Sequence, residues 1–466
     1  MPRIYIETFG CQMNEADSQY VADRATAAGY SVAVKAEEAD VVVINTCTVR
    51  DNAERRAYGR MNHFKALKDA APGTRLVVMG CLAEQDRSRM RVLAPHVDAV
   101  FGTRELAQLG DQLAAWQPGF ADRIDFAEDR ALLDPFGGTA DGVAGAFSAL
   151  RAFVNVQRGC SYYCTFCIVP HVRGRFDHRP LGAVVRDVTA KVAAGAREVM
   201  LVGQTVNAWK DPASGEDFGA LCRAVGSVPG LERLSFISPH PKDFSEKTIA
   251  DLAAVPQLNP RMHLPMQSAS DAVLRRMNRK YTAALFHEKV ELVRRYLPGW
   301  AITTDLIVGF PGESDDDFEQ TLAYVRSGVF ANAFTFMYSI RRDTPAAHWE
   351  QVPREVAAAR FARLVDAQNA VTRAYHDGMI GRDVRALVTG PSKKDERKLA
   401  AKTLDNVTVV APMPEDYDEA SYANEPWIDV EVDTAHVWGC TGTIVRRAAR
   451  YAETGTAVER RAVSLL

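Results

Sequence analysis

The amino-acid sequence predicts an α/β protein with an N-terminal parallel α/β sheet domain, a central partial (βα)6 barrel and a small C-terminal β-barrel. Two observations lead to this prediction. Apolar, strand-like runs alternate with helical segments over most of the chain, which is the pattern of parallel sheets covered by helices. Nearer the C-terminus, short strand-like segments follow one another without helices between them, which is typical of a small barrel. We expect these parts at 1–116 (N-terminal domain), 117–148 (linker), 149–380 (central barrel), 381–448 (C-terminal barrel) and 449–466 (tail).

The composition limits the classes of protein to consider. With 466 residues, of which 47% are hydrophobic, the chain is long enough for about three domains with real cores. Its net charge of −3 gives no overall basic field, so binding of nucleic acid has to depend on local patches. The first residues lack a secretory pattern, and no run approaches the ~18 apolar residues of a membrane span. We therefore expect a cytoplasmic protein without membrane contact, whose grouped cysteines bind metal or catalyse rather than form disulfides. We also expect a monomer.

Three cysteines of the N-terminal domain, Cys11, Cys47 and Cys81, each follow a predicted strand. Ligands of parallel sheets bind beyond the carboxyl ends of the strands, so these thiols are expected to converge there. A single free cysteine is often just a small buried apolar residue. Three cysteines in register favour a metal site. The strands are expected at 4–10, 40–46, 75–80 and 97–101, and the helices at 15–28, 49–67, 84–93 and up to residue 113.

Four neighbours of these cysteines also carry expectations. Gly10 and Gly80 directly precede two of the three thiols, which fits a backbone that approaches a bulky cofactor closely. Asn14 and Asp17 lie near the start of the first predicted helix. We expect both to be ordinary helix caps.

A second group of cysteines, Cys160, Cys164 and Cys167, lies within eight residues, directly after the first strand of the central domain. A structural zinc site uses four ligands, and a cubane iron–sulfur cluster is normally held by four thiolates. Three thiolates on one loop predict a cluster with one iron open for another ligand. His171 leaves an alternative, because Cys164-x2-Cys167-x3-His171 resembles half of a zinc site that Cys160 would complete.

The central domain repeats strand and helix about six times over 225 residues. This rhythm indicates a full or partial barrel, whose catalytic groups belong at the carboxyl ends of the strands. The strands are expected at 152–157, 198–203, 232–236, 261–264, 301–308 and 332–338, and the helices at 181–194, 217–226, 245–254, 270–277, 283–296, 315–326 and 353–376.

Several strand ends of this domain carry side chains that suit a ligand. Gln204 and Asn207 follow the second strand, and Gln267 follows the fourth. Asp305 is a polar residue within the fifth strand, whose apolar end leads into a Gly/Pro turn that can accept a flat ring. Any one of these segments is explained by turn chemistry, just as Ser314 is by helix capping. Their position on one rim makes them candidate binding residues.

The Cys-x3-Cys-x2-Cys spacing, with an aromatic residue before the last cysteine, resembles the radical S-adenosylmethionine (SAM) superfamily. That resemblance implies a [4Fe–4S] cluster on Cys160, Cys164 and Cys167, with SAM chelating the open iron. An electron donor such as flavodoxin or ferredoxin would supply the electron that cleaves SAM. The candidate SAM contacts are then Phe166, Gln204, Asn207, Gln267 and Asp305.

Two sets of motifs narrow this resemblance. The set Thr8–Asn14, Asn45–Cys47, Gly80–Cys81 and Tyr163–Cys167 resembles the methylthiotransferases of this superfamily, and the set Gln267–Asp271, Met277–Thr282 and Gly390–Asp395 resembles their bacterial tRNA branch. The narrower resemblance implies that Cys11, Cys47 and Cys81 hold a second [4Fe–4S] cluster that carries the attacking sulfur. Two SAM molecules would be used per turnover, one to make a radical that takes hydrogen from carbon 2 of N6-isopentenyladenosine at tRNA position 37, and one to methylate the sulfur.

Two other functions compete with this one. The first is the same chemistry on threonylcarbamoyl-adenosine in tRNA or on a ribosomal-protein aspartate, against which the Asn278–Thr282 motif argues by resemblance. The second is a non-catalytic RNA-binding protein in which iron–sulfur clusters or zinc are structural. Metal analysis separates the methylthiotransferase from a zinc-stabilised protein. The enzyme should hold roughly eight irons per chain, and the zinc protein about one zinc and little iron.

The C-terminal part is expected to contain strands at 384–388, 406–410 and 428–432 and a last one near 440–445. By resemblance it is a TRAM-like domain that binds RNA, and its basic strip would contact phosphates. An acidic insertion near 412–425 interrupts the family pattern on one face. Cys222 and Cys440 fit no cluster spacing and are expected to be structural. The basic strip consists of Lys393, Lys394, Arg397, Lys398 and Lys402, of which the first four are the candidate RNA contacts, and Arg446, Arg447 and Arg450 lie at its end.

Overall fold

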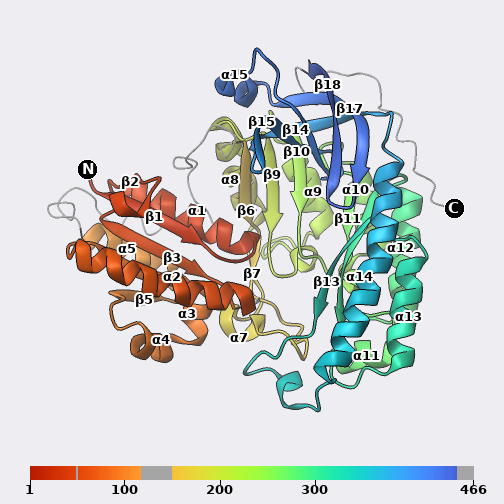
Figure 1. The fold of residues 1–466 in the computed structure, drawn as a ribbon, viewed down its shortest axis with the longest axis horizontal. Helices are drawn as coiled ribbons and strands as arrows, with labels where there is room; N and C mark the ends of the chain where they lie inside the picture. The colour runs from red at the N-terminus through yellow and green to blue at the C-terminus, as the bar shows by residue number, and fades with distance from the viewer. Residues whose placement is uncertain (49–50, 117–149, 449–466) are drawn as a thin grey trace. The chain divides into compact units, whose positions relative to one another are not determined.

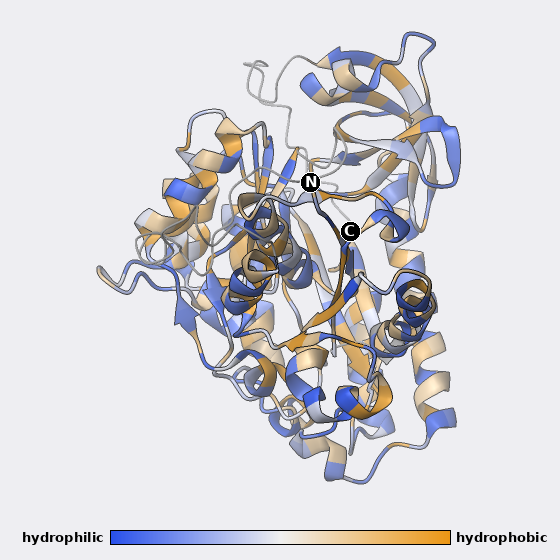
Figure 2. Cartoon of the chain, turned by 90° about the vertical axis from the view of Figure 1, so that its left-hand side faces the viewer, coloured by the Kyte–Doolittle hydropathy of each residue, from blue (hydrophilic) through white to orange (hydrophobic). Residues whose placement is uncertain are grey.

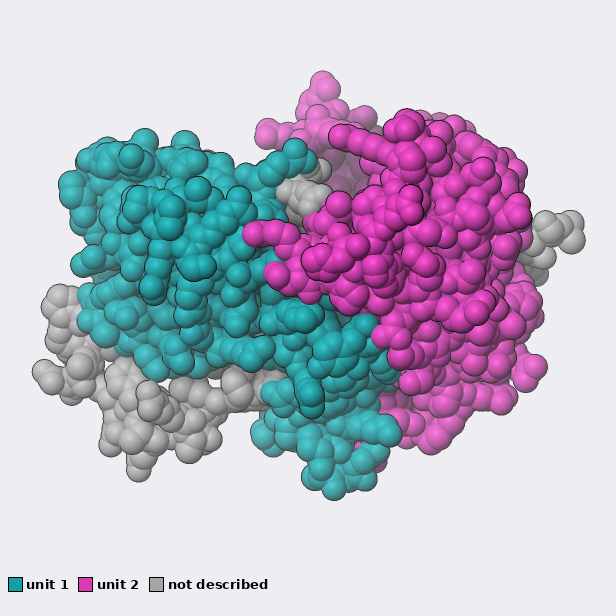
Figure 3. Space-filling model, turned by 90° about the horizontal axis from the view of Figure 1, so that it is seen from below, with its two compact units in different colours: residues 1–145, 152–163, 167–215 teal, residues 146–151, 164–166, 216–466 magenta. Residues whose placement is uncertain are grey.

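The computed structural model describes residues 1–48, 51–116 and 150–448. The predicted linker, 117–148, and the predicted tail, 449–466, lie outside these residues. The chain divides into two compact units, coloured separately in Figure 3. Unit 1 is made of residues 1–145, 152–163 and 167–215, and unit 2 of residues 146–151, 164–166 and 216–466.

Unit 1 begins with a five-stranded sheet in the order β2-β1-β3-β4-β5 (Figure 1). All four neighbouring pairs are parallel, as predicted from the alternation of strands and helices. The short second strand was not expected, because two residues are too few to show a period. The strands are β1 (Arg3–Thr8), β2 (Ser31–Val32), β3 (Val41–Thr46), β4 (Arg75–Gly80) and β5 (Ala99–Phe101).

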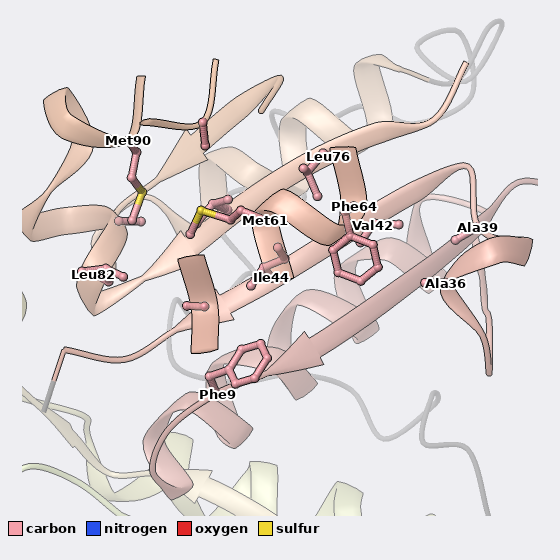
Figure 4. Packing of buried hydrophobic residues seen from close by; sticks show 14 of the residues in the cluster. Phe9, Ala36, Ala39, Val42, Ile44, Met61, Phe64, Leu76, Leu82 and Met90 are labelled. Atoms are coloured by element: carbon pink, nitrogen blue, oxygen red, sulfur yellow. The ribbon is translucent and has the colours of Figure 1, made fainter. Parts of the chain in front are cut away.

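This sheet is packed on both faces, which explains the unbroken apolar runs. Successive side chains of a strand point to opposite faces. Val42 and Ile44 of β3 therefore join the cluster of Figure 4 with Met61 and Phe64. Val41 and Val43 pack in a second cluster on the other face. Burying each such Val or Ile contributes about 1.5–3 kcal/mol. A parallel sheet buried on both sides presents its binding surface only at the strand ends.

The helices of this domain follow the prediction with one correction. The single helix expected at 84–93 is two helices, because the backbone leaves helical geometry at Asp86, whose φ is −114°. The first of the two starts earlier than expected, at Cys81. Cys81 is therefore a helical residue rather than a loop residue. The helices are α1 (Gln12–Ala27), α2 (Asp51–Ala70), α3 (Cys81–Gln85), α4 (Arg87–Leu93) and α5 (Leu106–Ala115).

The remainder of unit 1 carries the second cysteine loop except for residues 164–166, which belong to unit 2. β6 lies beside β9, and the two-residue strands β7 and β8 pair antiparallel on either side of the loop and of a short helix, α7. The elements are β6 (Arg151–Asn155), β7 (Gln157–Arg158), α7 (Val169–Arg173), β8 (Asp177–His178), α8 (Leu181–Ala193), β9 (Glu198–Val202) and the 3-10 helix η2 (Val206–Ala208).

Unit 2 continues the alternation of strand and helix, so that the six predicted strand–helix pairs are all present. β11, β12 and β13 form a parallel sheet. Ser314 caps α13 as expected, within a capping box completed by Asp317. The elements are α9 (Phe218–Gly226), β10 (Arg233–Phe236), α10 (Glu246–Ala253), β11 (Arg261–His263), α11 (Asp271–Arg276), α12 (Ala283–Tyr296), β12 (Ala301–Val308), α13 (Asp315–Arg326), β13 (Asn332–Met337) and α14 (Arg354–Asp377).

The C-terminal part of unit 2 is a closed five-stranded barrel in the order β14-β15-β16-β18-β17. The prediction missed β15, because its charged residues hide the alternation that buries Leu399, Ala401 and Thr403. The acidic insertion contains a short helix, α15, capped by Asp418, which accepts a hydrogen bond from the Ser421 amide. The elements are β14 (Asp383–Ser392), β15 (Asp395–Thr403), β16 (Thr408–Pro412), α15 (Glu419–Asn424), β17 (Trp427–His436) and β18 (Gly439–Ala448).

Figure 2 shows the apolar residues along the strands, and helices that carry both apolar and polar residues. This distribution is that of water-facing helices packed on sheets. Among the described helices, none has the length and apolar character needed to cross a membrane.

Candidate metal centre

The three N-terminal thiols lie at the ends of adjacent strands. Cys11 occupies the N-cap position of α1 just beyond β1, Cys47 follows β3, and Cys81 starts α3 after β4. Cys47 and Cys81 are buried and Cys11 is half-buried. Burial raises the pKa of the Cys81 thiol to about 12, Arg173 opposes this, and the other two thiols add to it. The structure thus brings the three thiols within electrostatic reach of one another, as the sequence predicts.

Gly10 and Gly80 allow the thiols to approach one another, because a side chain at either position would clash with the neighbouring strand end. Gly80 has φ of 103°, and a Cβ there would lie 2.4 Å from the Thr46 carbonyl oxygen. A Cβ on Gly10, whose φ is 143°, would lie 2.7 Å from Cys47 Cβ. Both glycines are therefore needed for close packing against the neighbouring strand end.

Asn14 organises the polar side of this site, and its prediction as a helix cap is wrong. Cys11 holds the N-cap position, and no side chain caps the helix. Asn14 is fully buried, and its Nδ2 donates to Asn45 Oδ1 at 2.8 Å and to the Thr46 carbonyl oxygen at 2.8 Å. Cys11 Sγ donates to Asn14 Oδ1 at 3.5 Å. A primary amide that is satisfied in this way fixes the strand ends that carry Cys11 and Cys47.

Asp17 is not a helix cap either. Its carboxylate is buried and accepts a hydrogen bond from Arg173 Nη2 at 2.7 Å. The same guanidinium donates from Nε to Cys81 Sγ at 3.3 Å. Burial alone would lower the pKa of Arg173, but Asp17 and the thiols outweigh it and hold this pKa well above its ordinary value. A buried cation thus faces the three-thiol site.

The second cysteine loop is anchored differently along its length. In unit 1, the Cys160 amide donates to the Gly174 carbonyl oxygen at 3.0 Å, and Cys160 Sγ lies 3.4 Å from Thr205 Oγ1. Cys160 and Cys164 are buried, and Cys167 is half-buried. His171, the alternative zinc ligand, lies in α7 and is exposed.

Residues 164–166 of this loop belong to unit 2 and are held by its Met277–Thr282 motif. The Thr165 amide donates to the Met277 carbonyl oxygen at 3.1 Å, and Thr165 Oγ1 donates to the Arg276 carbonyl oxygen at 2.8 Å. Arg279 Nη1 donates to Cys164 Sγ at 3.4 Å. The motif that indicated the branch of the family therefore also contacts a predicted cluster ligand.

Arg279 is a functional candidate that the sequence analysis did not single out. Its other donor contacts are the Tyr281 hydroxyl, 3.1 Å from Nε, and the Pro265 carbonyl oxygen. Burial acts to lower the pKa of Arg279, while Tyr281 and Cys164 raise it and prevail. None of these hydrogen-bond partners is a carboxylate. A buried cation requires a counter-charge, and thiolates of a cluster would supply one.

No group of three His, Cys, Asp or Glu side chains in the described part of the chain is placed to hold a single metal ion. A cubane makes a different demand, because each of its cysteine ligands binds a different iron. The sulfurs around it therefore stand further apart than the ligands of one ion. The chemistry of the two donor sets, three thiols each with one buried arginine, fits such a cluster.

The predicted SAM contacts divide between the two units. In unit 1, Gln204 follows β9 and Asn207 is buried in η2. In unit 2, Phe166 packs edge-on against Phe310, at 6.2 Å between ring centroids. The other two lie together in unit 2, where the amide of Gln267 donates to the carbonyl oxygen of Asp305 at 2.8 Å.

Two of these residues have features that suit a polar ligand. Gln204 Oε1 and Nε2 are both buried without a hydrogen-bond partner among the described residues. Such an amide costs about 1–3 kcal/mol per unsatisfied group, so a ligand that bonds it would be stabilised. Gln267 has φ of 68°, a strained value for a residue with a side chain, of the kind that gathers at ligand sites. The carboxylate of Asp305 lies 3.3 Å from His263 Nε2.

The four predicted RNA contacts of the basic strip are all exposed, but two of them also face a carboxylate. Lys393 and Lys394 are exposed at the turn between β14 and β15. Arg397 Nε and Lys398 Nζ lie 3.1 Å and 3.8 Å from carboxylate oxygens of Asp395. The two turn lysines are therefore the stronger candidates for phosphate contact.

The two remaining cysteines are buried in cores. Cys222 is fully buried on α9, where burial raises the pKa of its thiol, and Cys440 packs inside the C-terminal barrel. Burial raises the pKa of Cys440 to about 11. Burial therefore favours the neutral thiol form of both, which fits the expected structural role.

Comparison with known proteins assigns the chain. Residues 3–102 match the family described as uncharacterized protein family UPF0004, and residues 154–325 match the radical SAM superfamily. A tRNA-2-methylthio-N(6)-dimethylallyladenosine synthase of Thermobifida fusca is 42% identical over 406 residues, which cover 86% of this chain and 81% of the relative. That of Acidothermus cellulolyticus is 43% identical over 416 residues, covering 87% and 82%. The chain belongs to the tRNA-2-methylthio-N(6)-dimethylallyladenosine synthase family.

Membership in this radical SAM family implies a [4Fe–4S] cluster and SAM. The fold agrees with the assignment. The radical SAM methyltransferase TsrM of Kitasatospora setae aligns with a TM-score of 0.53 at 14% identity, over 74% of this chain and 75% of that one. At this identity the likeness shows the fold alone, which is the mixed α/β architecture that the sequence predicts.

Proposed function

We propose that this protein methylthiolates tRNA, replacing the hydrogen on carbon 2 of N6-isopentenyladenosine at position 37 with a methylthio group. The observation that carries the proposal is the presence of two cysteine triads in one member of the synthase family. Cys160, Cys164 and Cys167 would hold the cluster that binds SAM. We assign the sulfur-carrying [4Fe–4S] cluster to the triad at the ends of β1, β3 and β4.

The cofactors supply reactivity that side chains lack. An aromatic C–H bond has no usable acidity, so the bound cluster and SAM must open it. The described residues contribute a loop with three thiols, which would leave one iron of a bound cluster open to SAM, and Gln204, whose buried amide is available to a polar ligand. We further propose two SAM molecules per turnover and a flavodoxin- or ferredoxin-like electron donor.

The protein's own part in the reaction is to position groups and exclude water. The Asn14–Asn45 pair holds two strand ends in register, which fixes Cys11 and Cys47. The Met277–Thr282 motif holds the Cys164–Phe166 segment. These contacts would hold Cys11, Cys47 and Cys164 in place.

Binding of tRNA would depend on local charge, because the net charge of −3 gives no general attraction to RNA. Lys393 and Lys394 are exposed on the C-terminal barrel and would contact phosphates. We propose a cytoplasmic monomer that acts on free tRNA.

The proposal is tested by separating the two halves of the chemistry. Cys160→Ala should abolish release of 5′-deoxyadenosine from SAM. Cys47→Ala should retain part of that release but form no methylthiolated nucleoside in isopentenylated tRNA. Persistent SAM cleavage in Cys160→Ala would refute the first assignment, and methylthiolated tRNA from Cys47→Ala would refute the second.

A further inference from the structure

The short helix α7 contacts both cysteine sets within unit 1. It starts at Val169, two residues after Cys167. Arg173, its last residue, donates to Cys81 Sγ, and the next carbonyl, of Gly174, accepts the amide hydrogen of Cys160. Two consecutive residues therefore contact one cysteine of each triad.

Apolar packing supports the same contact. Ile168 and Val172 form a buried cluster with Cys81. The Val172 carbonyl oxygen also accepts a hydrogen bond from Thr103 Oγ1. Because close-packed groups do not shift freely, a displacement of α7 would move Cys81 and the Cys160 backbone together.

The guanidinium of Arg173 is held from a second side. Arg173 Nη2 lies 2.7 Å from Asp17 Oδ2, and the side chains of Arg173 and Asp17 are only 4% and 1% exposed. Asp17 lies one turn after Asn14 on α1, so both polar residues reach the thiol site from the same helix. Arg173 Nε faces Cys81 while Nη2 faces Asp17, which fixes the direction of the N–H···S contact.

The energetics of the buried Arg173–Asp17 pair favour a role for Arg173 other than stabilising the fold. A buried ion pair adds little net stability compared with well-packed apolar residues. A hydrogen bond to a cluster's sulfur ligand withdraws charge from that sulfur and stabilises the reduced cluster, which raises the reduction potential. A buried, immobile cation beside the thiol has the same effect.

We infer that Arg173 is a positioning residue of the sulfur-carrying cluster: oriented by Asp17, it donates to the Cys81 ligand, raises the potential of that cluster and keeps Cys81 in register with the Cys160 loop. This inference rests on the proposed function, because it requires a second cluster on Cys11, Cys47 and Cys81.

The test isolates the second cluster in the full chain. Cys160, Cys164 and Cys167 are replaced by alanine, and the remaining cluster is followed by electron paramagnetic resonance during redox titration. Into this background we add Arg173→Gln with Asp17→Asn, which removes both buried charges so that neither is left unpaired. The inference predicts a lower midpoint potential and an altered signal. An unchanged potential and signal would overturn it.

A matched control uses another buried ion pair of unit 1, Arg179 with Asp187, at 2.7 Å. Arg179→Gln with Asp187→Asn should leave the potential and the signal unchanged. An equal shift in this control would show that the effect is only structural. A background protein without about four irons would instead refute the second cluster itself, and so the proposed function rather than the role of Arg173.

A second measurement uses the chain with all its cysteines. The Asp17→Asn, Arg173→Gln variant should lose about 10–100-fold in methylthio transfer, as is typical when a partner of a metal ligand is removed, and a much smaller factor in the rate of SAM cleavage. Arg173→Lys should recover part of the transfer, because it keeps the charge beside Asp17. Equal loss of cleavage and transfer, or no loss of transfer, would contradict the inference.

Discussion

Replacing Gly80 by alanine tests the geometry on which the three-thiol site depends. Gly80 directly precedes Cys81 and has φ of 103° and ψ of −162°, a region used essentially by glycine alone. Forcing another residue into it costs about 1–3 kcal/mol. The added Cβ would also lie 2.4 Å from the Thr46 carbonyl oxygen and 2.6 Å from Asn45 Oδ1. Overpacking of this kind costs typically about 1–3 kcal/mol more.

The clash matters for function because the obstacle is the backbone that leads into Cys47. Backbone atoms cannot rotate away as the end of a side chain can, so the ends of β3 and β4 must separate. We expect Gly80→Ala to lower the free energy of unfolding by about 2–6 kcal/mol. We also expect it to lose about four of roughly eight irons after anaerobic reconstitution, since Cys47 and Cys81 no longer share a site.

Gly195 provides the matched control. Its φ is 107°, close to that of Gly80, but a Cβ there would meet nothing within 4 Å. Gly195→Ala should therefore lose only the backbone term of about 1–3 kcal/mol and keep all its iron. Urea unfolding and iron analysis of the two variants side by side make the comparison. Equal stability and full iron in Gly80→Ala would refute the reasoning.

Three further predictions follow from the structure. Arg279→Leu removes the donor to Cys164 and should slow 5′-deoxyadenosine release by about 10–100-fold; an unchanged rate by chromatography would exclude a role for this contact. Burial and the cations Arg279 and Lys242 lower the pKa of His240 to about 2, so protons bind the unfolded chain preferentially and stability is lost as pH falls below about 6.5. Between pH 7.5 and 5.5 the wild type should lose about 1.4 kcal/mol more than His240→Gln in urea unfolding, and parallel losses would contradict this. Exchanging Lys393 and Lys394 for glutamate should weaken tRNA binding and reduce the salt dependence of its logarithmic affinity by about one unit per lysine, whereas an unaltered salt slope in filter binding would place the RNA elsewhere.

Most helices and strands of this protein could be predicted, because short-range patterns of apolar and polar residues determine them. Val41–Ile44 is an unbroken apolar run because helices cover both faces of its sheet. Cys47 follows the strand that contains this run, and Cys11 and Cys81 likewise follow predicted strands. This repetition predicted three thiols at one edge of the sheet. The failures were also local in origin, since the charges of Asp395–Thr403 obscured a strand with a buried face.

The polar partners of the thiols could not be predicted, because they come from distant parts of the chain. Arg173 is 92 residues from Cys81 and 156 from Asp17, and Arg279 is 115 residues from Cys164. Spacing and periodicity report only on neighbours within one element. Asn14 and Asp17 therefore resembled helix caps, although the fold places both in the interior. The motif containing Arg279 was recognised as a family mark, but its contact with the cysteine loop required the structure.

The most direct test of the central claim is mass spectrometry of tRNA nucleosides. Cells that lack this protein are compared with the same cells carrying the wild type or Cys160→Ala. The proposed function predicts that 2-methylthio-N6-isopentenyladenosine is absent without the protein, is restored by the wild type only, and is replaced by its unmodified precursor in the other two strains. Persistence of the methylthio nucleoside in cells without the protein, or its restoration by Cys160→Ala, would contradict the account.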